Sequence, residues 1–206
     1  MLEVIKEEGK TEEEALNKIL EANKLNKYDI FTKTEFQEGK LFKGSKYTVF
    51  AIKKDDIKKL IEEFVYNLST LMNIKIESDI LNREDTYNIT LVSDNNSILI
   101  GKDGKTLNAI QIMIRQLVKK ETDLNIKINL DVANYKIKKL KNIEYEVKKI
   151  AKEVLETKVD ASLDPMNSYE RRMVHNLING YDNLETESVG EGITRHVIIK
   201  YVEKAK

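Results

Sequence analysis

The sequence Ile100-Gly101-Lys102-Asp103-Gly104-Lys105 carries the strongest local signal in the chain. Two glycines three residues apart let the backbone approach a ligand closely, because glycine tolerates conformations that other residues avoid. A helix that begins near Gly104 would direct unpaired backbone amides and the positive end of its dipole toward the same place. Lys102 and Lys105 add positive charge. The stretch therefore predicts a phosphate-binding loop, and the simpler alternative is a loop that only turns the chain.

The segments around this loop predict a small α+β unit. A helix begins at Asp55, with apolar residues at helical spacing along one face. Two strands, Ile74–Leu81 and Tyr87–Val92, follow as an antiparallel hairpin. After the loop, the spacing predicts a second amphipathic helix that ends near Glu121 and then a strand over Asn125–Val132. The order of elements is α-β-β-α-α-β, with the glycine-rich loop between the last two helices.

The residues before Asp55 predict a separate β-α-β module. Met1–Lys6 alternates polar and apolar side chains like a strand, and Thr11 is placed to cap a helix. The strands Asp29–Phe36 and Lys46–Ile52 follow, separated by a turn between Gly39 and Gly44.

The residues after the central unit predict two helices and a strand. A long basic helix covers Tyr135–Thr157, and a short helix covers Ser168–Asn179. Asn167 followed by Glu170 is the pattern of a capping box at the start of the short helix. The alternation over Ile193–Val202 predicts a final strand. We therefore expect an α+β protein of three small modules, each a small sheet packed with helices, with boundaries at 1–54, 55–134 and 135–206.

Composition argues against an enzyme and against a membrane span. The chain has no cysteine, which excludes disulfides and thiolate metal sites and favours a cytoplasmic protein. Its two histidines follow no metal-binding spacing, and no nucleotide-binding loop or paired acid and base can be identified. We therefore expect no cofactor, no metal and no catalytic residue. No apolar run approaches the roughly 18 residues that span a bilayer.

The net charge of zero hides an uneven distribution. Residues 1–40 have seven lysines and ten acidic side chains, a balance of −3. Residues 101–141 have ten basic and four acidic side chains, a balance of +6. A basic surface in the middle of the chain is consistent with nucleic-acid binding.

Arg171 and His175 are a second candidate pair. They are four residues apart and therefore share one face of the short helix, where together they can hold a phosphate or stack on a base. An exposed charged helix is the alternative on spacing alone. Tyr169 beside them is available to stack a base, although we expect it to pack beneath the helix.

Ile100-Gly101-Lys102-Asp103-Gly104-Lys105, within its order of elements, resembles a K-homology (KH) domain of the type II arrangement. In that family the GxxG loop clamps about four nucleotides of a single strand. The resemblance assigns this clamp to Gly101, Lys102, Asp103 and Gly104, flanked by Ile100 and Lys105. The run from Pro165 to His175 resembles the Arg-x-x-x-His domain, a small single-stranded nucleic-acid binder, and the later strand with Arg195 matches it too.

A KH domain followed by an Arg-x-x-x-His domain, behind a short N-terminal module, resembles the bacterial Jag family, also called KhpB or EloR. The resemblance implies a regulator or chaperone that binds single-stranded RNA. It also implies pairing with a small single-KH-domain protein, a possible homodimer and a role in cell elongation and envelope synthesis. Two alternatives stay open: a protein–protein adaptor with incidental nucleic-acid binding, and a binder of single-stranded DNA.

If the basic segment binds a single strand, affinity must fall as salt rises. We expect the logarithm of the binding constant to fall with the logarithm of salt concentration, with a slope of about −0.7 for each phosphate neutralised. Titration of a labelled random single-stranded RNA pool at two or more salt concentrations measures this slope. An affinity that does not change with salt would contradict an electrostatic single-strand site.

Overall fold

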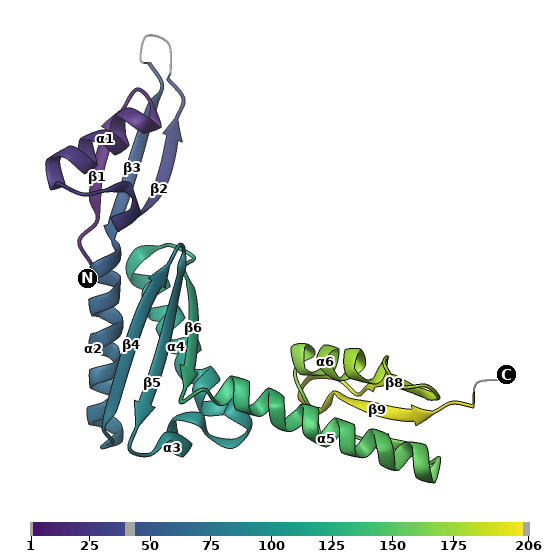
Figure 1. Ribbon diagram of the computed structural model, residues 1–206. Helices are drawn as coiled ribbons and strands as arrows, with labels where there is room; N and C mark the ends of the chain where they lie inside the picture. Colours follow the sequence, from purple (N-terminus) through teal and green to yellow (C-terminus); the bar gives the residue numbers. More distant parts are fainter. Residues whose placement is uncertain (1, 40–43, 204–206) are drawn as a thin grey trace. The chain divides into compact units, whose positions relative to one another are not determined.

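A computed structural model describes residues 2–39 and 44–203. The chain divides into two compact units, Met1–Ala133 and Asn134–Lys206. It forms three sheets of three strands each, and every sheet is packed with helices (Figure 1). The expected α+β class is confirmed. The expected turn between Gly39 and Gly44 lies mostly outside the described residues.

The first sheet has the strand order β1-β3-β2, and both outer strands pair antiparallel with β3. Its elements are β1 (Ile5–Gly9), α1 (Glu12–Asn23), the 3-10 turn η1 (Lys27–Asp29), β2 (Ile30–Gln37) and β3 (Lys46–Lys53). Thr11 caps α1 as expected, because its hydroxyl accepts a 3.1 Å hydrogen bond from the amide of Glu14. Ala15 and Ile19 of α1 belong to one core cluster with Val49 of β3.

The second sheet has the order β4-β5-β6, with β4 antiparallel and β6 parallel to β5. The elements are α2 (Lys54–Met72), β4 (Ile76–Arg83), β5 (Thr86–Ser93), α3 (Asn96–Ile100), the 3-10 turn η2 (Lys102–Gly104), α4 (Lys105–Thr122) and β6 (Lys127–Val132). The expected order α-β-β-α-α-β is confirmed. Parallel strands need a crossover, and α3, η2 and α4 form it. Ile61, Ile89, Ile114 and Leu130 are at most 1% exposed in the core beneath the helices.

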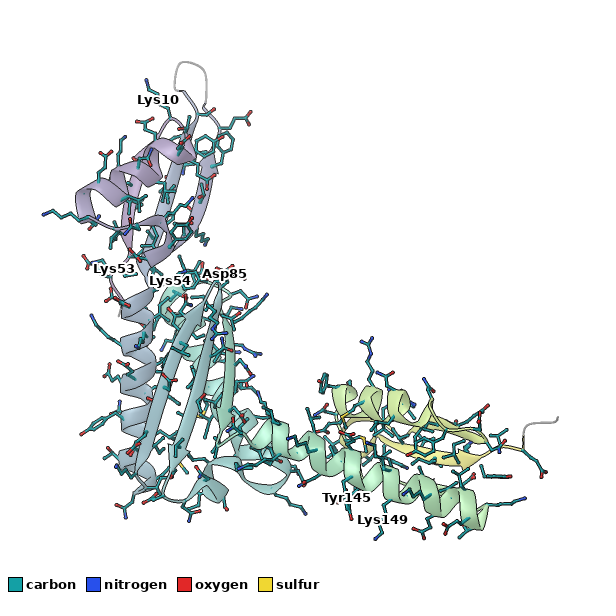
Figure 2. All side chains as sticks on the ribbon, in the orientation of Figure 1. Lys10, Lys53, Lys54, Asp85, Tyr145 and Lys149 are labelled. Atoms are coloured by element: carbon teal, nitrogen blue, oxygen red, sulfur yellow. The ribbon has the colours of Figure 1, made fainter. Side chains whose placement is uncertain are left out.

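The first two sheets are joined at Lys54, where β3 passes directly into α2. The hydroxyl of Tyr87 donates a 2.8 Å hydrogen bond to the backbone oxygen of Lys54, and burial raises the pKa of this tyrosine. The Lys54 ammonium lies 4.9 Å from the ring centre of Phe31 (Figure 2 labels Lys54). Lys33 of β2 forms a 2.7 Å ion pair with Asp123, which lowers the pKa of Asp123 and raises that of Lys33.

The third sheet, in the second unit, has the order β7-β9-β8 and is antiparallel throughout. Its elements are α5 (Tyr135–Thr157), β7 (Ala161–Ser162), α6 (Ser168–Ile178), β8 (Leu184–Val189), the 3-10 turn η3 (Gly192–Thr194) and β9 (His196–Tyr201). Val147 of α5, Val174 of α6 and Val197 of β9 are at most 1% exposed in a shared core cluster.

The start of α6 is held by the capping box that the sequence predicted. The side-chain oxygen of Asn167 accepts 3.0 Å hydrogen bonds from the amides of Tyr169 and Glu170. In return, a Glu170 oxygen accepts a 2.9 Å bond from the Asn167 amide. The other Glu170 oxygen lies 2.8 Å from the ammonium of Lys139 on α5, and Glu170 is only 4% exposed. One buried carboxylate therefore joins the two helices.

Two expected strands differ from the structure at their ends. The strand expected over Met1–Lys6 is instead Ile5–Gly9, because antiparallel pairing with β3 continues as far as Gly9. The strand expected over Ile193–Val202 is His196–Tyr201, because the amide of Thr194 bonds back to Glu191 and closes the turn η3. Ile193 in that turn is 94% exposed.

Among the described residues, no helix is long and apolar enough to cross a membrane.

Replacing Glu170 tests the joint between α5 and α6. We expect Glu170→Ala to destabilise the second unit by about 2 kcal/mol or more, because it leaves the Lys139 ammonium half-buried and opposite no carboxylate. Glu170→Gln should cost less, since it keeps an acceptor for the Asn167 amide. Hydrogen exchange of the α5 and α6 peptides measures the effect. Glu156→Ala, at an exposed position of α5, is the matched control, and equal exchange in all three variants would contradict the assigned role.

Candidate nucleic-acid interface

The turn between α3 and α4 has a backbone that only glycine adopts readily. Gly101 has φ 68° and ψ −178°, a region that is essentially restricted to glycine. Asp103 and Gly104 are both left-handed, with φ of 56° and 82°. The Gly101 amide donates a 2.8 Å bond to the carbonyl of Ser97, and the Gly104 amide donates a 3.3 Å bond to the carbonyl of Gly101. The turn is therefore a closed, defined shape.

A second constraint on Gly101 comes from α4. A β-carbon at this position would lie 2.1 Å from the hydroxyl oxygen of Thr106 and 2.8 Å from its β-carbon. No side chain larger than hydrogen fits without a shift of the first turn of α4. Thr106, which the sequence did not single out, thus fixes how closely the loop lies against the helix.

Positive charge gathers where the turn passes into α4. Gly104 is the N-cap of this helix and offers no capping side chain, and no acidic residue lies in the first turn of α4. The first amides of α4 therefore lack a side-chain cap, and the helix dipole adds to the charge of exposed Lys102 and Lys105. Ile98 of α3 is 43% exposed, and Ile100 is half-buried. The site offers amides and ammonium groups for phosphate beside an apolar wall for bases.

On α6, the Arg171 guanidinium is anchored to its own helix start. One nitrogen donates a 2.9 Å hydrogen bond to the carbonyl of Met166, and the other lies 3.5 Å from the hydroxyl of Ser168. An arginine has five N–H donors in a planar fork, so donors remain for a phosphate. The anchoring holds the long side chain in one orientation and reduces the entropy lost on binding.

His175 faces the sheet. Its Nδ1 lies 2.6 Å from the hydroxyl of Thr186, and its Nε2 lies 3.0 Å from the hydroxyl of Ser188, both on β8. Each hydroxyl can donate or accept, so the two contacts suit either ring tautomer. The spacing of Arg171 and His175 did not reveal these partners. The histidine therefore ties α6 to β8, and a ligand that contacts it must do so beside these hydroxyls.

Tyr169 is exposed, which corrects the expectation that it packs beneath the helix. It is 67% exposed, because its position on α6 points away from the core formed by Val174 and Ile178. A shallow concavity of about 430 Å³ lies on this outer side of α6. Its lining residues are Tyr169, Arg172, Met173, Asn176 and Leu177. Arg195, just before β9, is exposed, and its carbonyl accepts a 3.1 Å bond from the amide of Met166.

The two groups of candidate residues belong to different units. Ile100–Lys105 lie in the first unit, and Arg171, His175 and Arg195 lie in the second. Within the second unit, Met166 connects Arg171 to Arg195 through its carbonyl and its amide. Among residues 2–39 and 44–203, no group of His, Asp and Glu side chains is placed to hold a metal ion.

Comparison with protein families finds matches in both units. A family model described as the KH domain of KhpA and KhpB matches residues 58–132. A model of the Arg-x-x-x-His domain matches residues 141–201. The first match contains the turn between α3 and α4, and the second contains Arg171, His175 and Arg195.

Comparison with curated proteins finds relatives along most of the chain. An RNA-binding protein KhpB from Clostridium symbiosum is 35% identical over 199 residues, which cover 93% of this chain and 88% of the relative. An RNA-binding protein KhpB from Bacillus subtilis is 31% identical over 160 residues, covering 72% of this chain and 77% of the relative. Another of that name from Streptococcus pneumoniae is 24% identical and covers 70% and 45%. These relatives are named as binding proteins and not as enzymes.

Gly101→Ala tests the shape of the turn. The backbone conformation alone should cost about 1–3 kcal/mol, and the contact with Thr106 adds to this. We expect faster hydrogen exchange across the turn and the start of α4, with the two cores unchanged. Gly180→Ala is the matched control, because a β-carbon there meets nothing closer than the Leu177 carbonyl at 3.7 Å. Equal exchange in the two variants would show that the turn does not need glycine at position 101.

Proposed function

The chain belongs to the KhpB family, and from this membership we propose that it binds single-stranded RNA through the turn between α3 and α4 and through α6. The observation that carries the proposal is the conformation of Gly101, which only glycine adopts and which directs the turn onto the uncapped start of α4. A phosphate there would meet backbone amides, a helix dipole and the ammonium groups of Lys102 and Lys105.

The clamp consists of Gly101, Lys102, Asp103 and Gly104, with Ile100 and Lys105 at its borders. Loops of this kind hold the backbone of about four nucleotides and leave the bases free to be recognised alongside. Neither Lys102 nor Lys105 is buried, so both ammonium groups can reach phosphates without a large desolvation cost.

The C-terminal contacts are Arg171, His175 and Arg195. Arg171 and Arg195 supply positive charge, while His175 stands beside two hydroxyls that can also donate to phosphate. Two weak sites on one chain gain from effective concentration when a single RNA reaches both. The intact chain should therefore bind a long RNA more tightly than either site alone.

Family membership also motivates the finer parts of the proposal. These are action as a regulator or RNA chaperone in the cytoplasm, a link to cell elongation and envelope synthesis, pairing with a small single-KH-domain protein, and a homodimer. Functional modules at 1–54, 55–134 and 135–206 complete the proposal.

Charge reversal at the clamp tests the function. We expect Lys102→Asp to weaken binding of a random single-stranded RNA pool by about tenfold or more at about 0.1 M salt, because one phosphate contact is lost and a repulsion is added. Arg171→Ala with His175→Ala should weaken it by about fivefold or more. Lys58→Asp, the same charge change on an exposed turn of α2, is the control and should bind like the parent chain.

Circular dichroism and thermal unfolding establish that each variant is folded. If both site variants bind RNA as the parent does, RNA binding lies elsewhere or is incidental, and an adaptor that contacts proteins becomes the better explanation. A parallel titration with single-stranded DNA of the same sequences measures the preference between the two nucleic acids, because only RNA offers the 2′-hydroxyl.

A further inference from the structure

The long helix α5 buries one side only. Val147, Ala151 and Val154 are at most 1% exposed and lie in the core cluster of the second unit, which includes Val174 of α6 and Val197 of β9. The opposite side of α5 meets no other element in that unit. Whatever its side chains do, they do not hold the fold together.

That outer side has one kind of charge. Seven exposed residues fall within an arc of about 120° around the helix axis, at about 3.6 residues per turn. They are Lys138, Lys141, Asn142, Tyr145, Lys148, Lys149 and Lys152. We call these seven residues the α5 stripe. It contains five lysines and no acidic residue, because the glutamates of this part of α5 lie on the flanks of the arc.

Little of this positive charge is neutralised by the protein. Lys148 forms a 2.5 Å ion pair with Glu144 on the flank, which raises the pKa of Lys148 and lowers that of Glu144. The other four lysines of the stripe form no ion pair with any residue that the structure describes. A helix that used its lysines for its own stability would pair them with glutamates one turn away. Here the ammonium groups are left to solvent.

An aromatic ring stands in the middle of the stripe. Tyr145 is 74% exposed, although its ring has apolar faces that proteins usually cover. Figure 2 shows Tyr145 and Lys149 pointing away from α6 and the third sheet. The two are one helical turn apart and therefore neighbours. An exposed ring between ammonium groups is the combination that single-stranded nucleic acid uses, with bases stacked on the ring and phosphates on the cations.

We propose that the α5 stripe is a third contact surface for single-stranded RNA, on which the backbone follows the lysines and a base stacks on Tyr145. The inference rests on the proposed function and extends it to a surface that neither the turn after α3 nor α6 includes. Charge complementarity selects the occupant: an acidic peptide would satisfy the lysines but would leave the faces of the tyrosine ring unused.

The geometry of α5 predicts when the surface matters. From Lys138 to Lys152 the stripe is about 21 Å long at 1.5 Å per residue. It lies on the opposite side of α5 from the core that α5 shares with α6, so one strand must pass around the helix to touch both. The stripe should therefore add affinity for long RNA and nothing for an oligonucleotide of about four nucleotides, which the clamp alone can hold.

The test uses the full chain with two substitutions in the stripe, Lys141→Glu and Lys149→Glu. Losing two phosphate contacts should weaken long single-stranded RNA by about 25-fold or more at about 0.1 M salt, and reduce the salt slope by about 1.4. Lys58→Glu with Lys59→Glu on α2 is the matched control, because both lysines are exposed and their ion pairs there contribute little. That control should bind like the parent chain.

Tyr145→Ala tests the stacking part of the inference. Losing one stacked base should weaken long RNA by about fivefold or more, and Tyr145→Phe should restore the affinity because its ring has the same faces. Neither substitution touches the core, so thermal unfolding should not change. Crosslinking of a 4-thiouridine RNA followed by mass spectrometry should place an adduct on the peptide that contains Tyr145.

The outcomes separate this inference from the function on which it rests. If the stripe variants bind long RNA like the parent while Lys102→Asp does not, the stripe proposal is wrong and RNA binding stands. If the stripe variants weaken short and long RNA equally, the lysines act only through the overall charge, and the proposal also fails. If Lys102→Asp and the stripe variants all bind like the parent, both proposals fail.

Discussion

A sheet of three strands can cover itself on neither face, and this chain builds three such sheets. Each one becomes stable by burying a single face beneath amphipathic helices: α1 on the first, α2, α3 and α4 on the second, and α5 and α6 on the third. The cores are consequently thin, and the outer sides of the helices and their ends remain at the surface. All the candidate RNA contacts are found in those places, so the same constraint that shapes the fold also leaves the surface on which binding can occur.

The clamp depends on a different kind of constraint, one of backbone conformation. Gly101 adopts dihedral angles that side chains exclude, and Thr106 occupies the space where a β-carbon would stand. These two facts hold the turn against the start of α4 without any side chain in the way. On α6, positioning is achieved by hydrogen bonds instead: Arg171 is held by a backbone carbonyl, and His175 by two hydroxyls of β8. A rigid turn and an anchored helix are both preorganised, which lowers the entropic cost of binding.

Local patterns were predicted well and pairing was not. The helices α2, α4 and α6, the cap at Thr11 and the capping box at Asn167 follow from residues within one or two turns of each other, and the structure has all of them. The strand ends near Met1–Lys6 and Ile193–Val202 were wrong, because a strand extends as far as its partner across the sheet allows. The two-residue strand β7 has too little sequence of its own to show a period.

Spacing along the chain was therefore enough to locate the GxxG turn, the shared helix of Arg171 and His175, and the type of each module. Only the folded structure placed Thr186 and Ser188 against His175, Lys139 against the buried Glu170, and Tyr145 on an open surface among lysines. The physical reason is the range of the interactions. Helix periods, caps and glycine turns depend on neighbours within a few residues, whereas burial and side-chain pairing depend on which distant segments meet, and no local pattern records that.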